Sequence, residues 1–343
     1  MKNKIIACFI AAACLCIQNG TVAAQRAPID SKSADPYIGA IVIDADTGQI
    51  LLEDHSDTKA YPASILKMMD LLIILEKINT GAMHLDDKIT ISAEVSKIGG
   101  SQVYLKEKEV FSVEELLYAL MIQSANDAAS ALAIQSAGSK EGFVALMNKR
   151  AREIGMKSTE FHSIHGLPPA KDQSPDMTTA RDLVRLAREL LKYPDCLRYT
   201  SCKERGFRDS KFVMRNHNHL LGSYPGCDGF KTGYFLKAGY SIVATAKRDN
   251  NRVIAVVLGS VSQKTRDNKA AELLSKGFAL IPPKPAPVAV TNAIAQPVVE
   301  KEKPGKGRAV WLVISLAMLV IIAGAAYRIF FYRPKKEDLV QRH

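Results

Sequence analysis

Three short motifs in this 343-residue chain combine the side chains that acyl transfer to a serine requires. The first is Ser64-Ile65-Leu66-Lys67, the second is Ser124-Ala125-Asn126, and the third is Lys231-Thr232-Gly233. Each motif alone is common by chance, and Ser56-Asp57-Thr58-Lys59 is an accidental match to the first. Because the three motifs occur together and in this order, they indicate an active-site serine hydrolase whose base is a lysine.

Lys67 is the candidate base for Ser64. A serine hydroxyl is a weak nucleophile and needs a base within hydrogen-bond reach. A lysine can accept that proton only if burial and neighbouring positive charge lower the pKa of its ammonium group toward neutrality. We expect Lys231 and the N-terminus of a helix to supply this positive charge.

The second and third motifs are expected to complete the site. Ser124 can relay a proton to the leaving group, and Asn126 can hold Lys67 or a substrate amide. Lys231 and Thr232, on a strand at a sheet edge, can bind a substrate carboxylate. Gly233 would let a ligand approach the backbone closely.

Periodic patterns predict the elements that position these motifs. Ser64 precedes an apolar helical pattern over residues 65–78, whereas Ser56 has no such pattern behind it. A capping box formed by Ser112 and Glu115 begins a helix before Ser124, so the second motif should lie in a loop between helices. Alternating segments at 38–43 and 49–53, and again at 240–246 and 252–258, predict two hairpins. Together these elements favour an α+β fold with an antiparallel sheet and helices on its faces.

Further stretches carry a resemblance to a known family. They are Ile43-Asp44-Ala45-Asp46-Thr47-Gly48, Ser124-Ala125-Asn126-Asp127-Ala128, Gly166-Leu167, Thr178-Thr179-Ala180-Arg181-Asp182-Leu183, Asp228-Gly229-Phe230-Lys231-Thr232-Gly233 and Ala238-Gly239-Tyr240. With the three motifs, they make the chain similar to penicillin-binding D-alanyl-D-alanine carboxypeptidases of low molecular mass. That serine peptidase family shares its fold with class A β-lactamases, and the similarity runs from about Tyr37 to Pro282.

The resemblance implies a five-stranded antiparallel sheet flanked by helices, with a helical subdomain. It implies that Ser64 is the acyl-enzyme nucleophile, that Lys67 is the proton acceptor and that no cofactor or metal takes part. The other residues that it assigns to the site are Ser124, Asn126, Lys231, Thr232 and Gly233, with Arg252 helping to hold the terminal carboxylate. Its implied partners are peptidoglycan stem peptides and, as covalent inhibitors, β-lactam antibiotics.

The chain departs from the family pattern at two places that affect specificity. After the third motif the family usually has a small or polar pair, whereas this chain has Tyr234-Phe235-Leu236. Where a second carboxylate-binding arginine is often found, this chain offers His217, with Arg215 nearby as a substitute, and the sequence leaves open which of them reaches the substrate.

Net charge, cysteine content and histidine spacing bear on other classes of protein. The formal net charge of +11 invites a nucleic-acid partner, but an export signal would separate the chain from nucleic acid. Three cysteines, Cys196, Cys202 and Cys227, remain after signal removal, and either one disulfide with a free thiol or three thiols is compatible with the sequence. The pair His217 and His219 lacks an evident third ligand, which disfavours a zinc peptidase.

The two ends of the chain predict export and anchoring. Residues 1–24 have the charge, apolar run and small residues of a signal peptide, and 25–36 lead into a catalytic domain at 37–282. A proline-rich linker at 283–308 precedes an uncharged run of 19 residues at 309–327, about 28 Å long as a helix and sufficient to cross a bilayer core. We therefore expect a single-pass membrane protein with an extracytoplasmic catalytic domain and a short cytoplasmic tail at 328–343.

The functional hypothesis is removal of the terminal D-alanine from peptidoglycan stem pentapeptides. The alternatives are a D,D-endopeptidase, a β-lactamase and a non-catalytic cell-wall sensor. The segment between Glu153 and Asp182 contains no Glu-x-x-x-Asn pattern of a class A β-lactamase, which favours slow release of bound penicillin. The intact serine and lysine motifs argue against a sensor.

Overall fold

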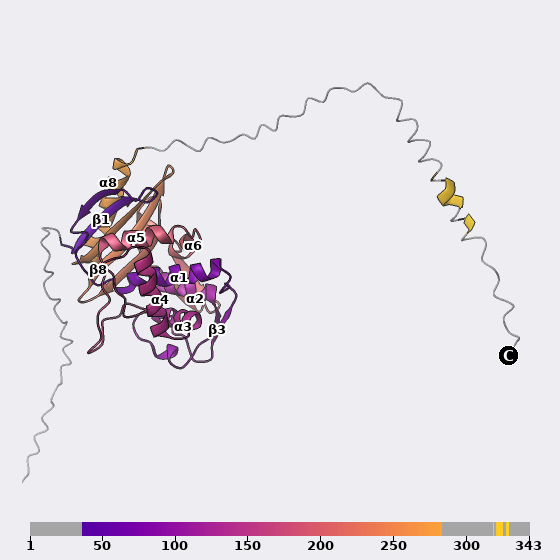
Figure 1. Cartoon of the computed structure of the whole chain (residues 1–343), viewed down its shortest axis with the longest axis horizontal. Coiled ribbons are helices and arrows are strands. Elements are labelled where there is room, and N and C mark those ends of the chain that lie inside the picture. Colours follow the sequence, from indigo (N-terminus) through magenta and orange to yellow (C-terminus); the bar gives the residue numbers. More distant parts are fainter. Residues whose placement is uncertain (1–35, 283–317, 319, 325–326, 329–343) are drawn as a thin grey trace, which may run out of the picture. The chain divides into compact units, whose positions relative to one another are not determined.

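A computed structural model describes residues 36–282, 318, 320–324 and 327–328. Its centre is a five-stranded sheet with the order β2-β1-β9-β8-β7, in which all neighbouring strands run antiparallel (Figure 1). The strands are β1 (Gly39–Asp44), β2 (Ile50–Asp54), β7 (Cys227–Phe235), β8 (Gly239–Arg248) and β9 (Asn251–Ser260). The α+β fold expected from the sequence is thus confirmed.

Both predicted hairpins are present in this sheet. Strands β1 and β2 pair across the turn that contains Gly48, whose φ is +79°. Strands β8 and β9 pair across Asp249 and Asn250, which both have positive φ, as the tight turns that match strand twist require. Because β9 lies between β1 and β8, the two ends of the domain meet in the middle of the sheet.

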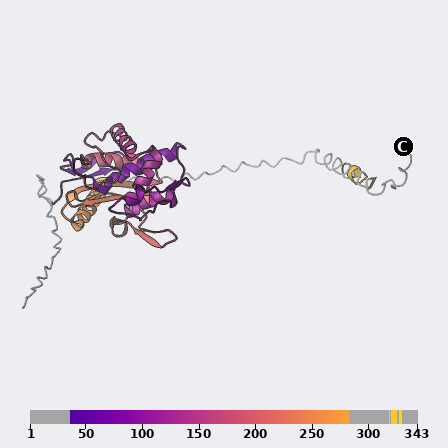
Figure 2. The ribbon, with the colours of Figure 1, turned by 90° about the horizontal axis from the view of Figure 1, so that it is seen from below.

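The two faces of the sheet are covered by different helices. Residues Ala40, Val42 and Val257 point toward α8 (Gln263–Leu280), while Ile41 and Val256 belong to the larger core beneath the other helices. This alternation follows from the two-residue period of a strand. Figure 2 shows the same arrangement from a second direction, with α8 in orange and the magenta helices on the opposite side of the sheet.

The helical part of the domain is built around one buried helix. Helix α1 (Lys67–Asn79) has nine buried residues and continues from the 3-10 turn η1 (Ala63–Leu66), so the helix predicted at 65–78 is confirmed. The predicted capping box is also present, with Ser112 accepting from Glu115 N at the start of α2. The remaining helices are α2 (Val113–Tyr118), α3 (Asn126–Ala137), α4 (Lys140–Glu153), α5 (Ala180–Leu190), α6 (Cys196–Thr200) and α7 (Leu220–Ser223), with short turns η2 (Val95–Lys97) and η3 (Ala119–Gln123).

Two small hairpins lie outside the main sheet. Strand β3 (Lys88–Thr90) pairs with β4 (Val110–Ser112), and β5 (Glu204–Phe207) pairs with β6 (Phe212–Arg215). Arg208, at the tip of the second hairpin, donates to the carbonyl oxygens of Val103 and Tyr104. These bonds attach the second hairpin to the loop that leads toward β4.

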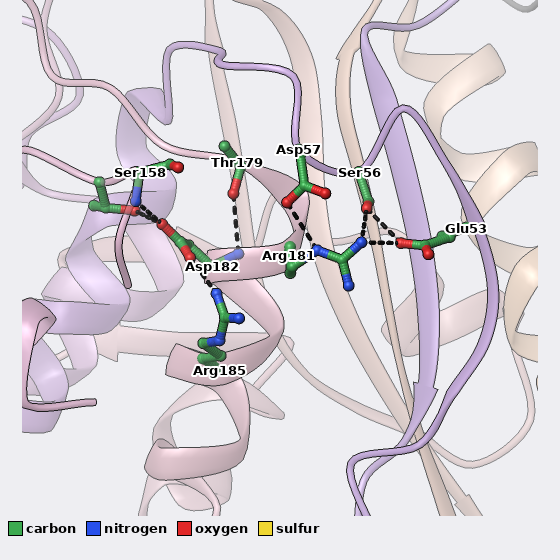
Figure 3. Close-up of polar contacts among 9 residues, drawn as sticks. Glu53, Ser56, Asp57, Ser158, Thr179, Arg181, Asp182 and Arg185 are labelled. Atoms are coloured by element: carbon green, nitrogen blue, oxygen red, sulfur yellow. Dashed lines mark hydrogen bonds and ion pairs between the residues drawn. The ribbon is translucent and has the colours of Figure 1, made fainter. Parts of the chain in front are cut away.

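The start of α5 is tied to its surroundings by charged and polar contacts (Figure 3). Arg181 donates to Asp57 at 2.8 Å and to Glu53 at 2.5 Å, and Ser56 also donates to Glu53. Asp182 accepts from the backbone N–H of Ser158 at 2.8 Å. Since Ser56 is held in this network and is almost fully buried, the accidental first-motif match has a structural role.

Most of the segments predicted near the two ends lie outside the described residues. This holds for the signal peptide at 1–24 and the linker at 283–308, for all but residue 36 of the lead at 25–36, and for all but residue 328 of the tail. Within the predicted span at 309–327, residues 318, 320–324 and 327 are described, and they are helical and exposed. No helix among the described residues is long and apolar enough to cross a membrane, so the anchor stays a prediction.

Candidate active site

The first motif lies where η1 passes into α1. Ser64 occupies the second position of η1, and Lys67 begins α1 one turn later. The Nζ of Lys67 lies 3.0 Å from the Oγ of Ser64. The helical spacing expected from the sequence therefore brings the expected nucleophile and its expected base into direct contact.

Lys67 is fully buried and makes three hydrogen bonds. Besides Ser64, its Nζ donates to the Oδ1 of Asn126 at 2.8 Å and to the carbonyl oxygen of His165 at 2.8 Å. Burial lowers the pKa of Lys67 to about 7, against the opposing effect of three nearby carboxyl groups. A substantial fraction of the lysine is consequently an uncharged amine near neutral pH, as a general base must be.

The second motif follows a single π-helical turn. Residues Ala119–Gln123 form this turn, and Ser124 after it adopts the left-handed conformation with φ 59°. The Oγ of Ser124 is buried and has no hydrogen-bond partner among the described residues, and Ser124 lines the same cavity as Ser64. Its hydroxyl is thus available to a ligand.

Asn126 is fixed on both sides by the preceding loop. Its backbone N–H donates to the carbonyl oxygen of Ser101 at 2.8 Å, and its Nδ2 donates to that of Gly99 at 2.8 Å. The Oδ1 is left to accept from Lys67. Asn126 therefore holds Lys67, which was one of the two roles expected for it.

The third motif lies on β7, at the edge of the sheet, as expected. Thr232 and Gly233 line the cavity, whereas Lys231 is 2% exposed and donates to the carbonyl oxygen of Thr232 at 3.2 Å. Burial, followed by the charge of Lys67, lowers the pKa of Lys231 well below its ordinary value. A Cβ on Gly233 would lie 2.6 Å from the carbonyl oxygen of Pro62, so only glycine lets β7 pass this close to η1.

A cavity of about 330 Å³ joins the three motifs. Ser64, Ser124 and Thr232 lie on its wall, together with His217 and Arg266. Of the two residues between which the sequence could not choose, His217 is thus at the cavity. Arg215 forms an exposed ion pair with Glu204 instead.

Arg252 does not join the other predicted site residues. Its two terminal nitrogens each lie 2.6 Å from a carboxylate oxygen of Asp228, and it is not among the residues that line the cavity. Arg252 pairs with Lys247 at one end of the β8–β9 ladder, whereas Tyr240 and Ser260 pair at the cavity end. An arginine at the start of β9 is therefore at the wrong end of the sheet.

Arg266, which the sequence analysis missed, is the arginine at the cavity. It lies in the first turn of α8, just after the cavity end of β9, and it is 3% exposed. Its Nε donates to the Oδ1 of Asp267 at 2.8 Å. The antiparallel pairing of the predicted hairpin could have identified this arginine, because it places residues after 258 beside the start of β8.

A tight turn at 162–166 supplies the third partner of Lys67, and it too was missed. Asp176 accepts from the backbone N–H groups of His162 and Ser163 at 2.6 and 2.9 Å, and from the Oγ of Ser163 at 2.7 Å. That Oγ accepts from Gly166 N at 3.0 Å, which closes the turn around His165. The carbonyl oxygen of His165 is thereby held against Lys67.

The three cysteines of the domain are thiols. Cys196 is buried, and Cys202 and Cys227 are partly buried. None of the three lines the cavity that contains Ser64.

The comparisons with known proteins identify a family. A family model described as D-alanyl-D-alanine carboxypeptidase matches residues 21–262. D-alanyl-D-alanine carboxypeptidase DacF of Bacillus subtilis is 36% identical over 281 residues, which are 81% of this chain and 71% of the relative. DacC of Escherichia coli is 34% identical over 80% of this chain and 70% of its own length.

Solved structures agree with this result. Penicillin-binding protein D2 from Listeria monocytogenes, in an ampicillin-bound form, superimposes with a TM-score of 0.65 at 31% identity and covers 71% of this chain and 98% of its own. The D-alanyl-D-alanine carboxypeptidase DacD from Francisella tularensis has a TM-score of 0.67 at 29% identity, covering 74% of this chain and 72% of its own.

Gly166 offers a test of how closely the turn at 162–166 must approach Ser64. Its φ is +72°, and a Cβ would lie 2.1 Å from the carbonyl oxygen of Ala63 and 3.0 Å from Ser64 N. We expect Gly166→Ala to displace the nucleophile and to slow acylation of Ser64 by about 10²-fold, the typical effect of a displacement of about 1 Å. The rate is measured with a labelled acylating substrate analogue.

Gly155→Ala is the matched control. Gly155 also has a positive φ, +78°, but a Cβ there would meet nothing within 4 Å. This variant carries the same kind of backbone strain and should acylate at the wild-type rate. If both variants lost the same fraction of the acylation rate, backbone strain, and not the contact with Ser64, would be the cause of the loss.

Proposed function

Because this chain belongs to the D-alanyl-D-alanine carboxypeptidase family and is a penicillin-binding serine carboxypeptidase, we propose that it trims the terminal D-alanine of peptidoglycan stem pentapeptides through an acyl-enzyme on Ser64. The observation that carries this proposal is the buried Lys67, whose Nζ lies 3.0 Å from the Ser64 hydroxyl at the wall of an open cavity. A serine with such a base can attack an amide carbonyl at neutral pH.

In the acylation step Ser64 gives its proton to the uncharged amine of Lys67 while its Oγ attacks the carbonyl carbon of the penultimate D-alanine. Asn126 and the carbonyl oxygen of His165 accept the remaining hydrogens of Lys67 and stabilise the ammonium that forms. The proton then passes to the leaving nitrogen, for which the unpartnered Oγ of Ser124 is placed as a relay. Free D-alanine leaves, and water later hydrolyses the ester on Ser64.

The substrate carboxylate would bind beside Thr232 and Arg266. Both residues line the cavity that contains Ser64, and a guanidinium group can hold a carboxylate in a bidentate manner. Lys231 lies buried behind Thr232. Recognition of a free terminal carboxylate supports carboxypeptidase action, because it selects the end of a peptide.

β-Lactamase activity is disfavoured by the composition of the cavity. A fast β-lactamase needs a group that activates water against the acyl-enzyme, but the cavity lining in the described part of the chain contains no aspartate or glutamate. Asp176, a buried carboxyl group in the segment that follows Glu153, is committed to the turn at 162–166. A D,D-endopeptidase uses the same acylation chemistry and remains the alternative for this site.

Release of D-alanine from a synthetic pentapeptide ending in D-Ala-D-Ala is the direct test of this activity. The wild-type protein should release D-alanine, whereas Ser64→Ala should release none and should fail to bind labelled penicillin. Circular dichroism verifies that the variant is folded. D-Alanine release by a folded Ser64→Ala variant, or labelling at Ser56, would refute the assignment of the nucleophile.

Arg266 and Arg252 form a matched pair for testing carboxylate recognition. Arg266→Ala removes a charge from the cavity and should lower kcat/KM for the pentapeptide by about 10- to 100-fold, the range for a lost hydrogen bond between charged groups. Arg252→Ala breaks the ion pair with Asp228 and should leave kcat/KM near the wild-type value.

A second substrate separates recognition from folding in the same experiment. A pentapeptide whose terminal carboxylate is converted to an amide should be cleaved poorly by wild type, and Arg266→Ala should reduce the difference between the two peptides. Loss of activity toward both peptides in equal proportion would indicate structural damage. If Arg252→Ala, and not Arg266→Ala, reduced the difference in cleavage rate between the acid and the amide peptide, Arg252 would be the carboxylate site.

We also propose that the protein is exported and anchored in the membrane through 309–327. The support is the signal-like composition of 1–24 and the uncharged run of 19 residues. In a bacterial host the protein should fractionate with membranes and should begin at Gln25 by mass spectrometry. A chain ending at Pro282 should become soluble. Recovery of the full chain in the soluble fraction with Met1 intact would contradict this proposal.

A further inference from the structure

Asp70 is a buried carboxyl group that the acylation mechanism does not use. It lies on α1 three residues after Lys67, hence one turn along the same helix face, and it is 1% exposed. Neither of its carboxylate oxygens has a hydrogen-bond partner among the residues that the structure describes. A carboxyl group in such a place needs an explanation, because burial without a donor is costly for its charged form.

Lys67 cannot supply the missing donor. The three hydrogens of its ammonium form are directed to Ser64, Asn126 and the carbonyl oxygen of His165. Asp70 therefore acts on Lys67 through charge alone, across the interior of the domain. Such an interaction is strong because little water lies between the groups to screen it.

The other carboxyl groups near Lys67 are held differently. Asp127 on α3 accepts from the backbone N–H groups of Val103 and Leu105. Asp176, before α5, accepts from two N–H groups and a hydroxyl in the turn at 162–166. Both of these carboxyl groups accept hydrogen bonds, whereas Asp70 has no donor among the described residues. Of the charges around Asp70, that of Lys67 favours its carboxylate form, whereas that of Asp176 disfavours it.

The remaining titratable groups around Lys67 are basic. Burial, followed by the charge of Lys67, lowers the pKa of His165 to about 4, so this imidazole is neutral at neutral pH. Burial, followed by the charges of Lys67 and Arg266, lowers the pKa of Lys231. Burial together with neighbouring positive charges that include Lys67 lowers the pKa of His217 to about 4. Burial raises the pKa of Asp70 well above its ordinary value, and the ammonium of Lys67 opposes this shift. Asp70 and Lys67 therefore favour each other's charged forms.

We propose that Asp70 is a positioning residue for acylation, whose carboxylate stabilises the ammonium form of Lys67 and so sets the lowest pH at which Lys67 can accept the proton of Ser64. This inference rests on Lys67 being the base in the function proposed above. Without the carboxylate, the ammonium of Lys67 would lose a stabilising charge, and the amine would persist to lower pH. Removal of the Asp70 carboxylate should therefore allow acylation of Ser64 at lower pH.

The test is the pH dependence of acylation by labelled penicillin, measured on the full-length protein in detergent between about pH 5 and pH 9. In wild type, acylation should rise with pH and reach half its maximum near the pKa of Lys67, about 7. In Asp70→Asn, which keeps the shape of the side chain, this midpoint should fall by about one to two pH units, the size expected for a charge about 6 to 12 Å away at an effective dielectric constant near 20.

Ser130→Ala is the control for a general disturbance of the core. Ser130 lies on α3, is fully buried and has a hydroxyl without a hydrogen-bond partner in the described part of the chain, but it carries no charge. The pH of half-maximal acylation in Ser130→Ala should coincide with that of wild type. A similar shift in Ser130→Ala would show that repacking, and not charge, moves the profile.

The outcomes separate this inference from the proposed function. If wild type is not acylated, or if Lys67→Arg is acylated at the wild-type rate, the proposed base is wrong. If wild type behaves as expected and the midpoint in Asp70→Asn is unchanged or higher, the role of Asp70 is overturned. Asp70→Leu provides a second uncharged variant with the same expected shift. Failure of both variants to fold would also overturn the proposal, because it would make Asp70 an architectural residue.

Discussion

The burial of Lys67 is the constraint on which the active site depends. A lysine inside a protein core is unfavourable in its charged form, and the fold compensates by surrounding Nζ with three acceptors from three separate segments. The same burial that costs stability brings the amine close to its uncharged form at neutral pH. Function and architecture therefore place opposing demands on one side chain, since acceptors that hold Lys67 also favour its charged form.

The elements around Lys67 can be understood as ways to deliver those acceptors. The π-helical turn before Ser124 redirects the chain so that α3 starts with Asn126 facing Lys67. The turn at 162–166 contributes a carbonyl oxygen, and Gly166 allows that turn to lie against η1. On the other side of η1, Gly233 lets the edge strand β7 approach η1 closely. Small residues occur where two backbones meet next to the nucleophile.

Sequence patterns predicted the local parts of this arrangement well. The spacing of Ser64 and Lys67 is a property of one helix, and the alternation in β8 and β9 is a property of two strands joined by a tight turn. The arginine at the cavity was harder to predict, because Arg252 and Arg266 lie near opposite ends of β9 and similarity to a motif does not reveal which end faces the cavity. The turn around His165 acts through a backbone oxygen, which leaves no trace in residue type.

The position of β9 in the middle of the sheet affects how the protein reaches its native state. Strand β1 pairs with β9, which joins Gly39 to Leu258, so the sheet cannot close until nearly the whole domain has been synthesised. Contacts between residues so far apart in sequence slow folding, because a long loop must be ordered before they form. Arg266 follows β9 in the chain, and Thr232 lies on β7, which joins the sheet through β8. A nascent or incompletely folded chain would therefore carry Ser64 and Lys67 at the start of α1 but would lack the part of the cavity wall that Thr232 and Arg266 form.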